Sequence, residues 1–285
     1  MASKNSGTAR KLLFLILVCA AGVAVWMGGC DKIASKFRSK AKTQPVKKER
    51  VVRHAPGMGV SGPKLAILLD DLGNDREAAE AVFAFHYPLT ISVLPYHAHS
   101  TEIAEEAQRR GLEVMLHLPM RAIANEMPEA HQLEPGMSGE EVARALNGML
   151  ESVPTASGVN NHEGSLATTD TKLMAELMPL LKQKDLFFVD SRTTAATVAF
   201  EAAEHAGVRS GFRNVPFLDD VQDVAAIRKQ LELAMRGAKE KGAAIAIGHP
   251  HAETLRALKE VLPRAEAEGV HLVVVSEVVK QAGRN

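Results

Sequence analysis

From Lys64 onward the sequence alternates short apolar runs with longer amphipathic stretches, and this alternation restricts the possible fold more than any other feature. Short apolar runs are typical of buried strands, whereas apolar residues at helical spacing indicate helices. Strands that alternate with helices favour a parallel sheet. Seven or eight of them favour an α/β fold, namely a distorted (β/α) barrel, with an open doubly wound sheet as the alternative. We expect strands at 65–69, 90–94, 113–116, 158–160, 186–189, 208–212, 243–247 and 270–275, and helices near 75–85, 100–110, 139–151, 171–183, 195–206, 221–241 and 252–267.

Charge is distributed unevenly along the 285 residues, although 34 Lys and Arg balance 34 Asp and Glu. Residues 1–54 hold 12 basic and two acidic side chains, which leaves 22 basic and 32 acidic ones in 55–285. We interpret this pattern as a basic arm joined to an acidic globule. An acidic globule binds the nucleic-acid backbone poorly, so we expect no nucleic-acid partner. The two cysteines, Cys19 and Cys30, both precede the globule, which excludes a disulfide or a thiolate metal site within it.

The first 30 residues have the composition of a signal peptide or a membrane anchor. Arg10 and Lys11 precede an uncharged run from Leu12 to Cys30, whose 19 residues would span about 28 Å as a helix, close to the hydrocarbon thickness of a bilayer. A basic start, an apolar centre and a small-residue end also describe a signal peptide. The end of the run resembles a bacterial lipoprotein processing site, which makes Cys30 a candidate for lipidation. Both interpretations remain open.

Residues 31–63 combine scattered basic side chains with proline and glycine and show no helical period. We interpret them as a flexible basic tether that is attracted to anionic lipid or wall polymer. The expected domains are therefore 1–30, 31–63 and a barrel at 64–285. We expect the protein in the bacterial cell envelope, anchored to the membrane and facing the periplasm. Nine basic residues follow the apolar run and three precede it, an arrangement that opposes export and that cleavage of the segment would make less unfavourable.

Polar residues stand where the expected strands end, and in a (β/α) barrel these ends share the face that carries active sites. Carboxylate oxygen and neutral imidazole nitrogen suit Zn²⁺ or a similar divalent ion, and a catalytic ion takes about three protein ligands. A remaining Asp and His can then accept and donate protons. The pattern indicates a metal-dependent hydrolase. The residues are Asp70 and Asp71, His117, Asn160, Asn161 and His162, Asp190 and Arg192, and His249.

Several of these residues also have a purely structural interpretation, and Asp70 or Asp71 is compatible with a cap on the helix that starts near residue 75. His117, between two leucines, is compatible with a buried histidine bonded to a backbone carbonyl, and Asp190 with Arg192 is compatible with an ion pair at the barrel rim. His249 precedes a proline and is compatible with a loop near a helix start. Asp219 and Asp220 also precede a helix, and we interpret them as helix caps. We place His97 and His99 on a solvated loop, and we leave His205, His251 and His271 out of the candidate site.

Several of these segments together resemble a known family. They are Leu69-Asp70-Asp71-Leu72-Gly73, His117-Leu118-Pro119-Met120, Asn160-Asn161-His162, Asp190-Ser191-Arg192-Thr193 and Gly248-His249-Pro250. In these segments the chain resembles the divergent polysaccharide deacetylase family of bacteria. That family is similar to the polysaccharide deacetylases with the NodB homology domain, carbohydrate esterase family 4. The resemblance spans about residues 64–280.

The resemblance implies a distorted (β/α) barrel that hydrolyses acetyl groups on a glycan, with an acetylated glycan or cell-wall polymer as the partner. Carried over by position, Asp70 resembles the general base, Asp71 a metal ligand, His117 the first metal histidine and His249 the general acid. Arg121 stands where the family's second metal histidine is usual, four residues after the first. We hypothesise that His162 supplies the missing imidazole to Zn²⁺ or another divalent cation. Asn160, Asn161, Asp190 and Arg192 are then supporting residues.

Two functions from different classes follow. One is a metal-dependent hydrolase that deacetylates an envelope polysaccharide, which the intact aspartates and histidines favour. The alternative is a non-catalytic envelope protein that retains the barrel to bind a glycan or a partner, which Arg121 favours.

Overall fold

The computed structural model describes residues 61–124, 129 and 131–281. The expected signal or anchor segment, Cys30 and residues 31–60 of the tether lie outside these residues. Within the part that is described, no helix is both long enough and apolar enough to cross a membrane.

The described residues form the α/β architecture that the alternating pattern predicts, a nearly closed (β/α) barrel. The strands form one sheet in the order β6-β5-β4-β3-β2-β1-β7, all paired in parallel, and β8 pairs with the first residues of β1. Each predicted strand range overlaps an observed strand. The strands are β1 (Lys64–Leu72), β2 (Thr90–Val93), β3 (Glu113–Met120), β4 (Gly158–Glu163), β5 (Phe187–Asp190), β6 (Ser210–Phe212), β7 (Ala243–Gly248) and β8 (His271–Val273).

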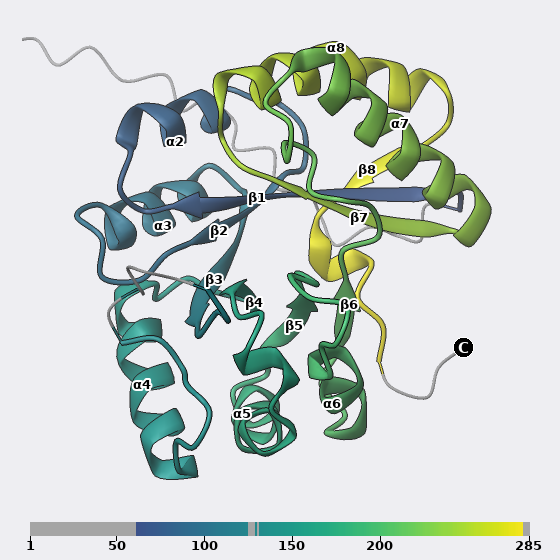
Figure 1. Ribbon diagram of the computed structural model, residues 1–285. Coiled ribbons are helices and arrows are strands. Elements are labelled where there is room, and N and C mark those ends of the chain that lie inside the picture. The colour runs from purple at the N-terminus through teal and green to yellow at the C-terminus, as the bar shows by residue number, and fades with distance from the viewer. Residues whose placement is uncertain (1–60, 125–128, 130, 282–285) are drawn as a thin grey trace, which may run out of the picture. The chain divides into compact units, whose positions relative to one another are not determined.

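Helices connect the strands and cover the outside of the barrel, with α7 and α8 on one side and α4, α5 and α6 on the other (Figure 1). Helix α4 begins with a capping box, in which Ser138 Oγ accepts from Glu141 N and the Glu141 carboxylate accepts from Ser138 N. Such a cap stabilises a helix by about 0.5–2 kcal/mol. The helices are α2 (Arg76–Phe83), α3 (Ser100–Arg109), α4 (Gly139–Ser152), α5 (Thr171–Gln183), α6 (Ala199–His205), α7 (Val224–Lys241) and α8 (Ala252–Ala267), with short 3₁₀ turns η1 (Ala167–Thr169) and η2 (Val275–Glu277).

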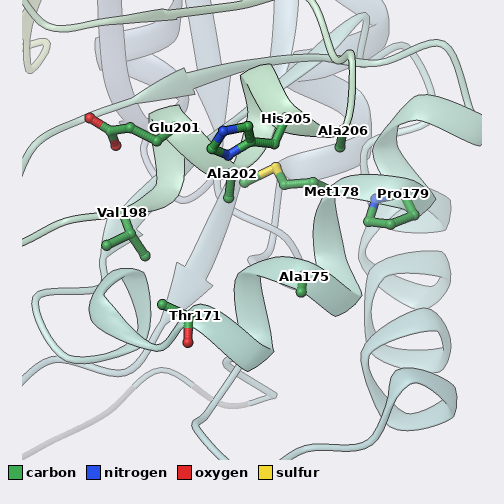
Figure 2. Close-up of a pocket in the computed structure, with 9 residues that line it drawn as sticks. All are labelled: Thr171, Ala175, Met178, Pro179, Val198, Glu201, Ala202, His205 and Ala206. Carbon is green, nitrogen blue, oxygen red and sulfur yellow. The ribbon is translucent and has the colours of Figure 1, made fainter.

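The helix layer contains an apolar cavity of about 490 Å³ between α5 and α6. Met178 and Pro179 line it from α5, and Ala202 and His205 line it from α6 (Figure 2). None of the site candidates from the sequence lines this cavity. The candidates lie instead at or just after the carboxyl ends of the strands.

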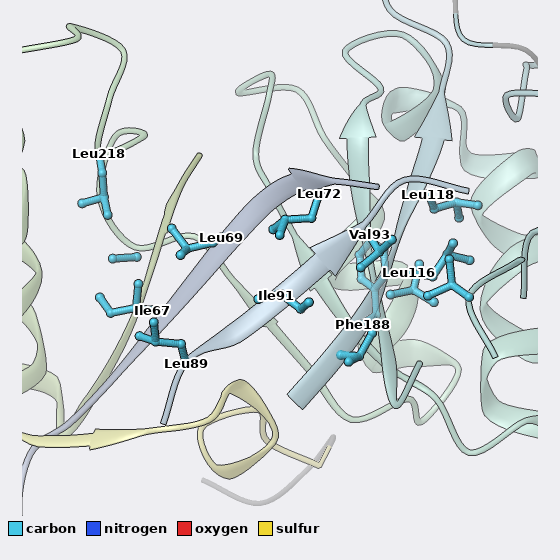
Figure 3. Packing of buried hydrophobic residues seen from close by; sticks show 14 of the residues in the cluster. Ile67, Leu69, Leu72, Leu89, Ile91, Val93, Leu116, Leu118, Phe188 and Leu218 are labelled. Carbon is cyan, nitrogen blue, oxygen red and sulfur yellow. The ribbon is translucent and has the colours of Figure 1, made fainter. Parts of the chain in front are cut away.

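The strands are buried on both faces because one face packs against the helices and the other fills the barrel. On β1, Leu65, Ile67 and Leu69 belong to the outer core beneath the helices, part of which Figure 3 shows. Ala66 and Leu68 belong instead to a separate inner core. The inner core is apolar through the middle of the barrel, so polar residues facing inward at the strand ends form a distinct layer above it.

The segment after β6 bridges the interval between β6 and β7. Asn214 N donates to Ile245 O at 3.0 Å, Ile245 N donates to Asn214 Oδ1 at 2.6 Å, and Leu218 N donates to Ile247 O at 2.8 Å. Strands β6 and β7 do not pair with each other, and the hydrogen bonds of this segment connect the two ends of the sheet instead. The segment also brings Asp219, the next residue, to the carboxyl end of β7.

Candidate active site

A bulge at the end of β1 directs two consecutive carboxylates into the same site. Leu69 and Leu72 pair with Ile91 and Val93 of β2, so Asp70 and Asp71 together face one residue of β2. Asp71 has a left-handed backbone with φ of 60°, a conformation that costs a non-glycine residue about 1–3 kcal/mol. Adjacent side chains on a regular strand point to opposite faces. The bulge removes this alternation, and both carboxylates lie within 4 Å of His117 Nε2.

Asp71, His117 and His162 form a compact set of possible metal ligands, which we call the first set. Asp71 Oδ1 lies 3.1 Å from His117 Nε2 and 3.1 Å from His162 Nδ1, and the two ring nitrogens are also 3.1 Å apart. His117 is buried, while the side chains of His162 and Asp71 are 18% and 38% exposed. The first set is thus buried on the barrel side and open to solvent at the mouth.

Asn160 connects this set to Asp70. Its Nδ2 donates to both oxygens of Asp70, at 3.0 and 3.1 Å, and lies 3.1 Å from Ser191 Oγ. Because the amide nitrogen faces a carboxylate, Oδ1 faces Ser92 and His117 and accepts from Ser92 Oγ and from His117 Nδ1. His117 therefore carries a proton on Nδ1, and its Nε2 faces Asp71. A bonded partner on one ring nitrogen fixes the tautomer that a histidine offers to a metal on the other.

The other supporting residues hold the strand ends together. Asn161 points away from the first set: its Oδ1 accepts from Ser191 N and its Nδ2 donates to Glu163 O, which joins the ends of β4 and β5. Asp190 accepts from Arg192 N and from the Thr197 hydroxyl. The interpretation of Asp190 and Arg192 as an ion pair is wrong for these described side chains, because the Arg192 guanidinium lies 3.4 Å from the centre of the Phe212 ring.

His249 approaches Asp71 from the opposite side of the site. Its Nε2 lies 3.6 Å from Asp71 Oδ2, while its Nδ1 donates to Asp219 Oδ1 at 2.9 Å. Asp219 Oδ2 accepts from His249 N and from the Thr254 hydroxyl of α8, both at 2.7 Å. Gly248 permits this approach, because a Cβ at that position would lie 3.1 Å from Leu218 Cβ.

The interpretation of Asp219 as a helix cap is therefore wrong. Helix α7 is capped by Asp223, whose side chain accepts from Ala226 N, while Asp219 is nearly fully buried and orients His249. His251, which we left out of the site, lies beside the same pair. Ligand atoms of Asp219, His249 and His251 all lie within 4.8 Å of one another, and we call these three residues the second set.

The pKa values of Asp70, Asp71 and His249 are shifted in different directions by their surroundings. Burial raises the pKa of Asp70 above its ordinary value, although the neighbouring His117 opposes the shift. Burial acts in the same direction on Asp71, but hydrogen bonds with His117 and His162 outweigh it and hold the pKa of Asp71 well below its usual range. For His249, burial lowers the pKa, but the bond to Asp219 and the charges of Asp219 and Asp71 outweigh it and raise the pKa to about 9.

Arg121, at the position where a second metal histidine is usual, directs its side chain to Glu134, with 3.7 Å between the charged groups. Its backbone accepts from Leu166 N and Ala167 N and donates to Leu133 O, so it anchors the loops beyond β3. The structure brings His162, from the neighbouring strand β4, to the place where a further imidazole faces Asp71 and His117.

Comparison with known proteins gives a consistent result. A family model described as divergent polysaccharide deacetylase matches residues 67–279. The uncharacterized protein YibQ of Escherichia coli (strain K12) is 37% identical over 219 residues, which cover 75% of this chain and 68% of YibQ.

Solved structures share the fold. The crystal structure of an uncharacterized protein from Agrobacterium tumefaciens C58 has a TM-score of 0.75 at 22% identity and covers 79% of this chain and 92% of its own. A carbohydrate esterase family 4 pseudoenzyme from Bacillus anthracis has a TM-score of 0.52 at 11% identity, over 76% of this chain and 66% of its own.

The family match spans nearly the whole described barrel and includes every strand-end residue that the sequence singled out. The relative at 37% identity extends over most of the same residues. These two findings confirm the resemblance inferred from the motifs, and the chain belongs to the divergent polysaccharide deacetylase family.

Proposed function

We propose that this protein is a metal-dependent hydrolase that removes acetyl groups from an envelope polysaccharide. The observation that carries the proposal is the convergence of Asp71, His117 and His162 on one point, with Asp70 and His249 close to that point from different strands.

The donor atoms of the first set fit a divalent cation such as Zn²⁺. One carboxylate oxygen and two imidazole nitrogens are typical zinc ligands. Their mutual separations of 3.1 Å are close to the roughly 3.3 Å expected between ligands around a tetrahedral zinc with bonds of about 2.0–2.1 Å. Two ring nitrogens that face each other without a cation need a proton between them, and a bound cation would take its place. When bound, the ion would supply Lewis-acid polarisation of the acetyl carbonyl and activation of the attacking water.

The chain's own residues would handle the protons. Asp70, which is buried and held by Asn160, would accept a proton from the water that attacks the acetyl carbonyl. His249, whose Nδ1 is bonded to Asp219, would donate its Nε2 proton to the leaving amine as the carbon–nitrogen bond breaks. The products would be acetate and the free amine of the glycan, which balances the reaction.

The place of action is part of the proposal. A signal peptide or anchor at residues 1–30, with Cys30 as a possible lipidation site, would place the barrel on the periplasmic side of a membrane. There it would meet acetylated glycan or cell-wall polymer.

A non-catalytic glycan- or partner-binding role is the second candidate. Arg121 in place of a metal histidine favours it, and a solved neighbour is described as a pseudoenzyme. Such a protein would keep the barrel without needing a metal.

The decisive experiment measures bound zinc and released acetate together. We expect the full-length protein, stripped with a chelator and supplied with ZnCl₂, to hold stoichiometric zinc and to release acetate from a chitin oligomer or from peptidoglycan. Asp71→Asn, which replaces a ligand oxygen by an amide of the same shape, should abolish zinc binding at the first set and acetate release. A wild-type protein that holds no zinc at the first set and releases no acetate from either polymer would leave the binding role as the better conclusion.

A further inference from the structure

Asp219, His249 and His251 repeat the composition of the first set on the far side of His249. Asp219 follows β6, whereas His249 and His251 lie between β7 and α8. One possible ligand atom from each residue lies within 4.8 Å of the others. The two sets meet at His249, whose Nε2 faces Asp71 at 3.6 Å while its Nδ1 faces Asp219 at 2.9 Å.

We propose that the second set is an inhibitory cation site, at which a second Zn²⁺ binds through His249 Nδ1, Asp219 Oδ1 and the ring of His251. The binding of the cation stands on these residues alone. Its inhibitory effect rests on the proposed function, because it requires His249 to act as the proton donor.

The positions of Asp219 and His249 require little movement to accept a cation. Asp219 Oδ1 and His249 Nδ1 are 2.9 Å apart and would separate by only a few tenths of an ångström to reach the roughly 3.3 Å expected around tetrahedral zinc. Asp219 Oδ2 stays bonded to His249 N and to the Thr254 hydroxyl, which fixes the carboxylate while Oδ1 faces the cation. The donor atom is therefore already oriented.

His251 can supply the third donor because its side chain is exposed and has no capping role. It occupies the N-cap position of α8, but its side chain makes no capping hydrogen bond. Its backbone N donates to His249 O at 2.8 Å, which keeps the two residues close, and the two rings are 5.8 Å apart. A rotation of the His251 ring therefore does not break a cap.

Cation binding at the second set would stop proton donation by His249. The cation takes the place of the proton on Nδ1, which is released to solvent, as is general when metals bind protonated ligands. The remaining Nε2 proton then belongs to a metal-bound imidazole, and its loss would leave an imidazolate. His249 would thus cease to be a usable acid even with the first set fully loaded.

The two sets should fill in a defined order. In the first set the three donor atoms already lie 3.1 Å from one another, and Asn160 holds the ring of His117 through Nδ1. In the second set the cation must displace the bond between His249 and Asp219. We therefore expect the first set to bind zinc more tightly.

The test is a zinc titration of the full-length, chelator-stripped protein by equilibrium dialysis with metal analysis, run in parallel with acetate release. We expect two classes of bound zinc, with activity rising as the tight class fills and falling as the weak class fills. His251→Ala should weaken the second class by at least about tenfold, remove the inhibition and leave the first class and the basal activity unchanged. His99→Ala is the matched control, because His99 is also an N-cap histidine whose side chain makes no capping bond, and it should change neither class.

Two results would overturn the proposal: a single class of bound zinc in the wild type, or a second class whose affinity is the same in His251→Ala. The proposed function is tested separately, by acetate release and by the effect of Asp71→Asn. Asp71→Asn should remove the first class and spare the second. A second class that depends on His251, in a protein that releases no acetate, would keep the cation site and overturn the hydrolase.

Discussion

The first and second sets contain the same residue types, one aspartate and two histidines. They differ in the residue that bonds Nδ1 of His117 in the first set and of His249 in the second. Behind His117 stands the neutral amide of Asn160, so its Nε2 is presented to a partner across the site. Behind His249 stands the carboxylate of Asp219, which stabilises a second proton on the ring and raises the pKa to about 9. The comparison teaches that the two partners act differently. The amide of Asn160 fixes the tautomer of His117, whose pKa is raised, against the effect of burial, by the carboxylates of Asp70 and Asp71. The carboxylate of Asp219, in contrast, itself stabilises the charged ring of His249.

The largest effect should follow from removing His162, the member of the first set that we propose in place of the usual second histidine. His162→Ala leaves two ligands, and we expect zinc affinity at the first set to fall by more than about 100-fold, since loss of outer-shell partners alone costs 10–100-fold. Acetate release should fall to background. Chelator competition measures the affinity.

A second histidine at position 121 should not repair this loss. The side chain of Arg121 is directed to Glu134, so Arg121→His combined with His162→Ala should remain as weak a zinc binder as His162→Ala. Recovery of stoichiometric zinc in the double variant would show that the ligand position belongs to residue 121 and not to His162.

Asp219→Asn tests the other side of the comparison. The amide can no longer stabilise a charged ring, so we expect kcat to fall on the order of 10²- to 10⁴-fold, the usual contribution of a positioned acid. Zinc at the first set should be unchanged, because its nearest contact with this pair is the 3.6 Å approach of His249 to Asp71. Equal losses of zinc and activity would mean that Asp219 supports the first set as well.

Asn160→Ala should give an intermediate effect. It leaves the buried carboxylate of Asp70 without the amide donor, which costs about 1–3 kcal/mol of the free energy of unfolding. It also frees His117 Nδ1, so zinc affinity should fall about 10–100-fold. Urea unfolding and chelator competition measure the two losses.

Asn161→Ala is the matched control for Asn160→Ala. It removes the bonds to Ser191 N and Glu163 O, which hold strand ends but do not touch the first set. We expect destabilisation without a change in zinc affinity. If both variants lose zinc equally, zinc affinity depends on the position of the strand ends and not on the hydrogen bond between Asn160 and His117.

The sequence predicts the barrel well because each element carries its own local pattern, yet some boundaries depend on the tertiary structure. We ended the third strand at residue 116, but β3 continues to Met120 through Pro119, since Leu118 and Pro119 pair with Asn161 and His162 of β4. The last predicted helix, 252–267, coincides with α8 because its apolar spacing is continuous.

The first set could be located from strand ends, but Asp219 and His251 could not. Asp219 resembles a cap in the sequence, and it is brought to His249 by backbone contacts of the segment after β6 with β7, among them the hydrogen bond of Leu218 N to Ile247 O across 29 residues of chain. His251 is an exposed loop residue whose relation to Asp219 depends on the same path. Long-range backbone contacts leave no periodic signal in the sequence. The one available signal is that Asp219 and Asp220 precede a helix, α7, that Asp223 already caps.

The smallest effect concerns Glu113, a half-buried carboxylate whose partners are neutral, unlike those of Asp71 and Asp219. Its Oε1 accepts from the Thr90 hydroxyl and from Ser276 N, both at 3.0 Å, and burial raises its pKa despite these bonds. A carboxyl with a higher pKa in the folded than in the unfolded state binds protons more tightly when folded, so wild-type stability falls as pH rises through the folded pKa. Glu113→Gln keeps an acceptor oxygen and cannot ionise, so its free energy of unfolding relative to wild type should increase with pH. Urea unfolding of both proteins across the acidic to neutral range measures this difference. A difference that does not change with pH would mean that the two neutral hydrogen bonds fully offset the effect of burial on the pKa of Glu113.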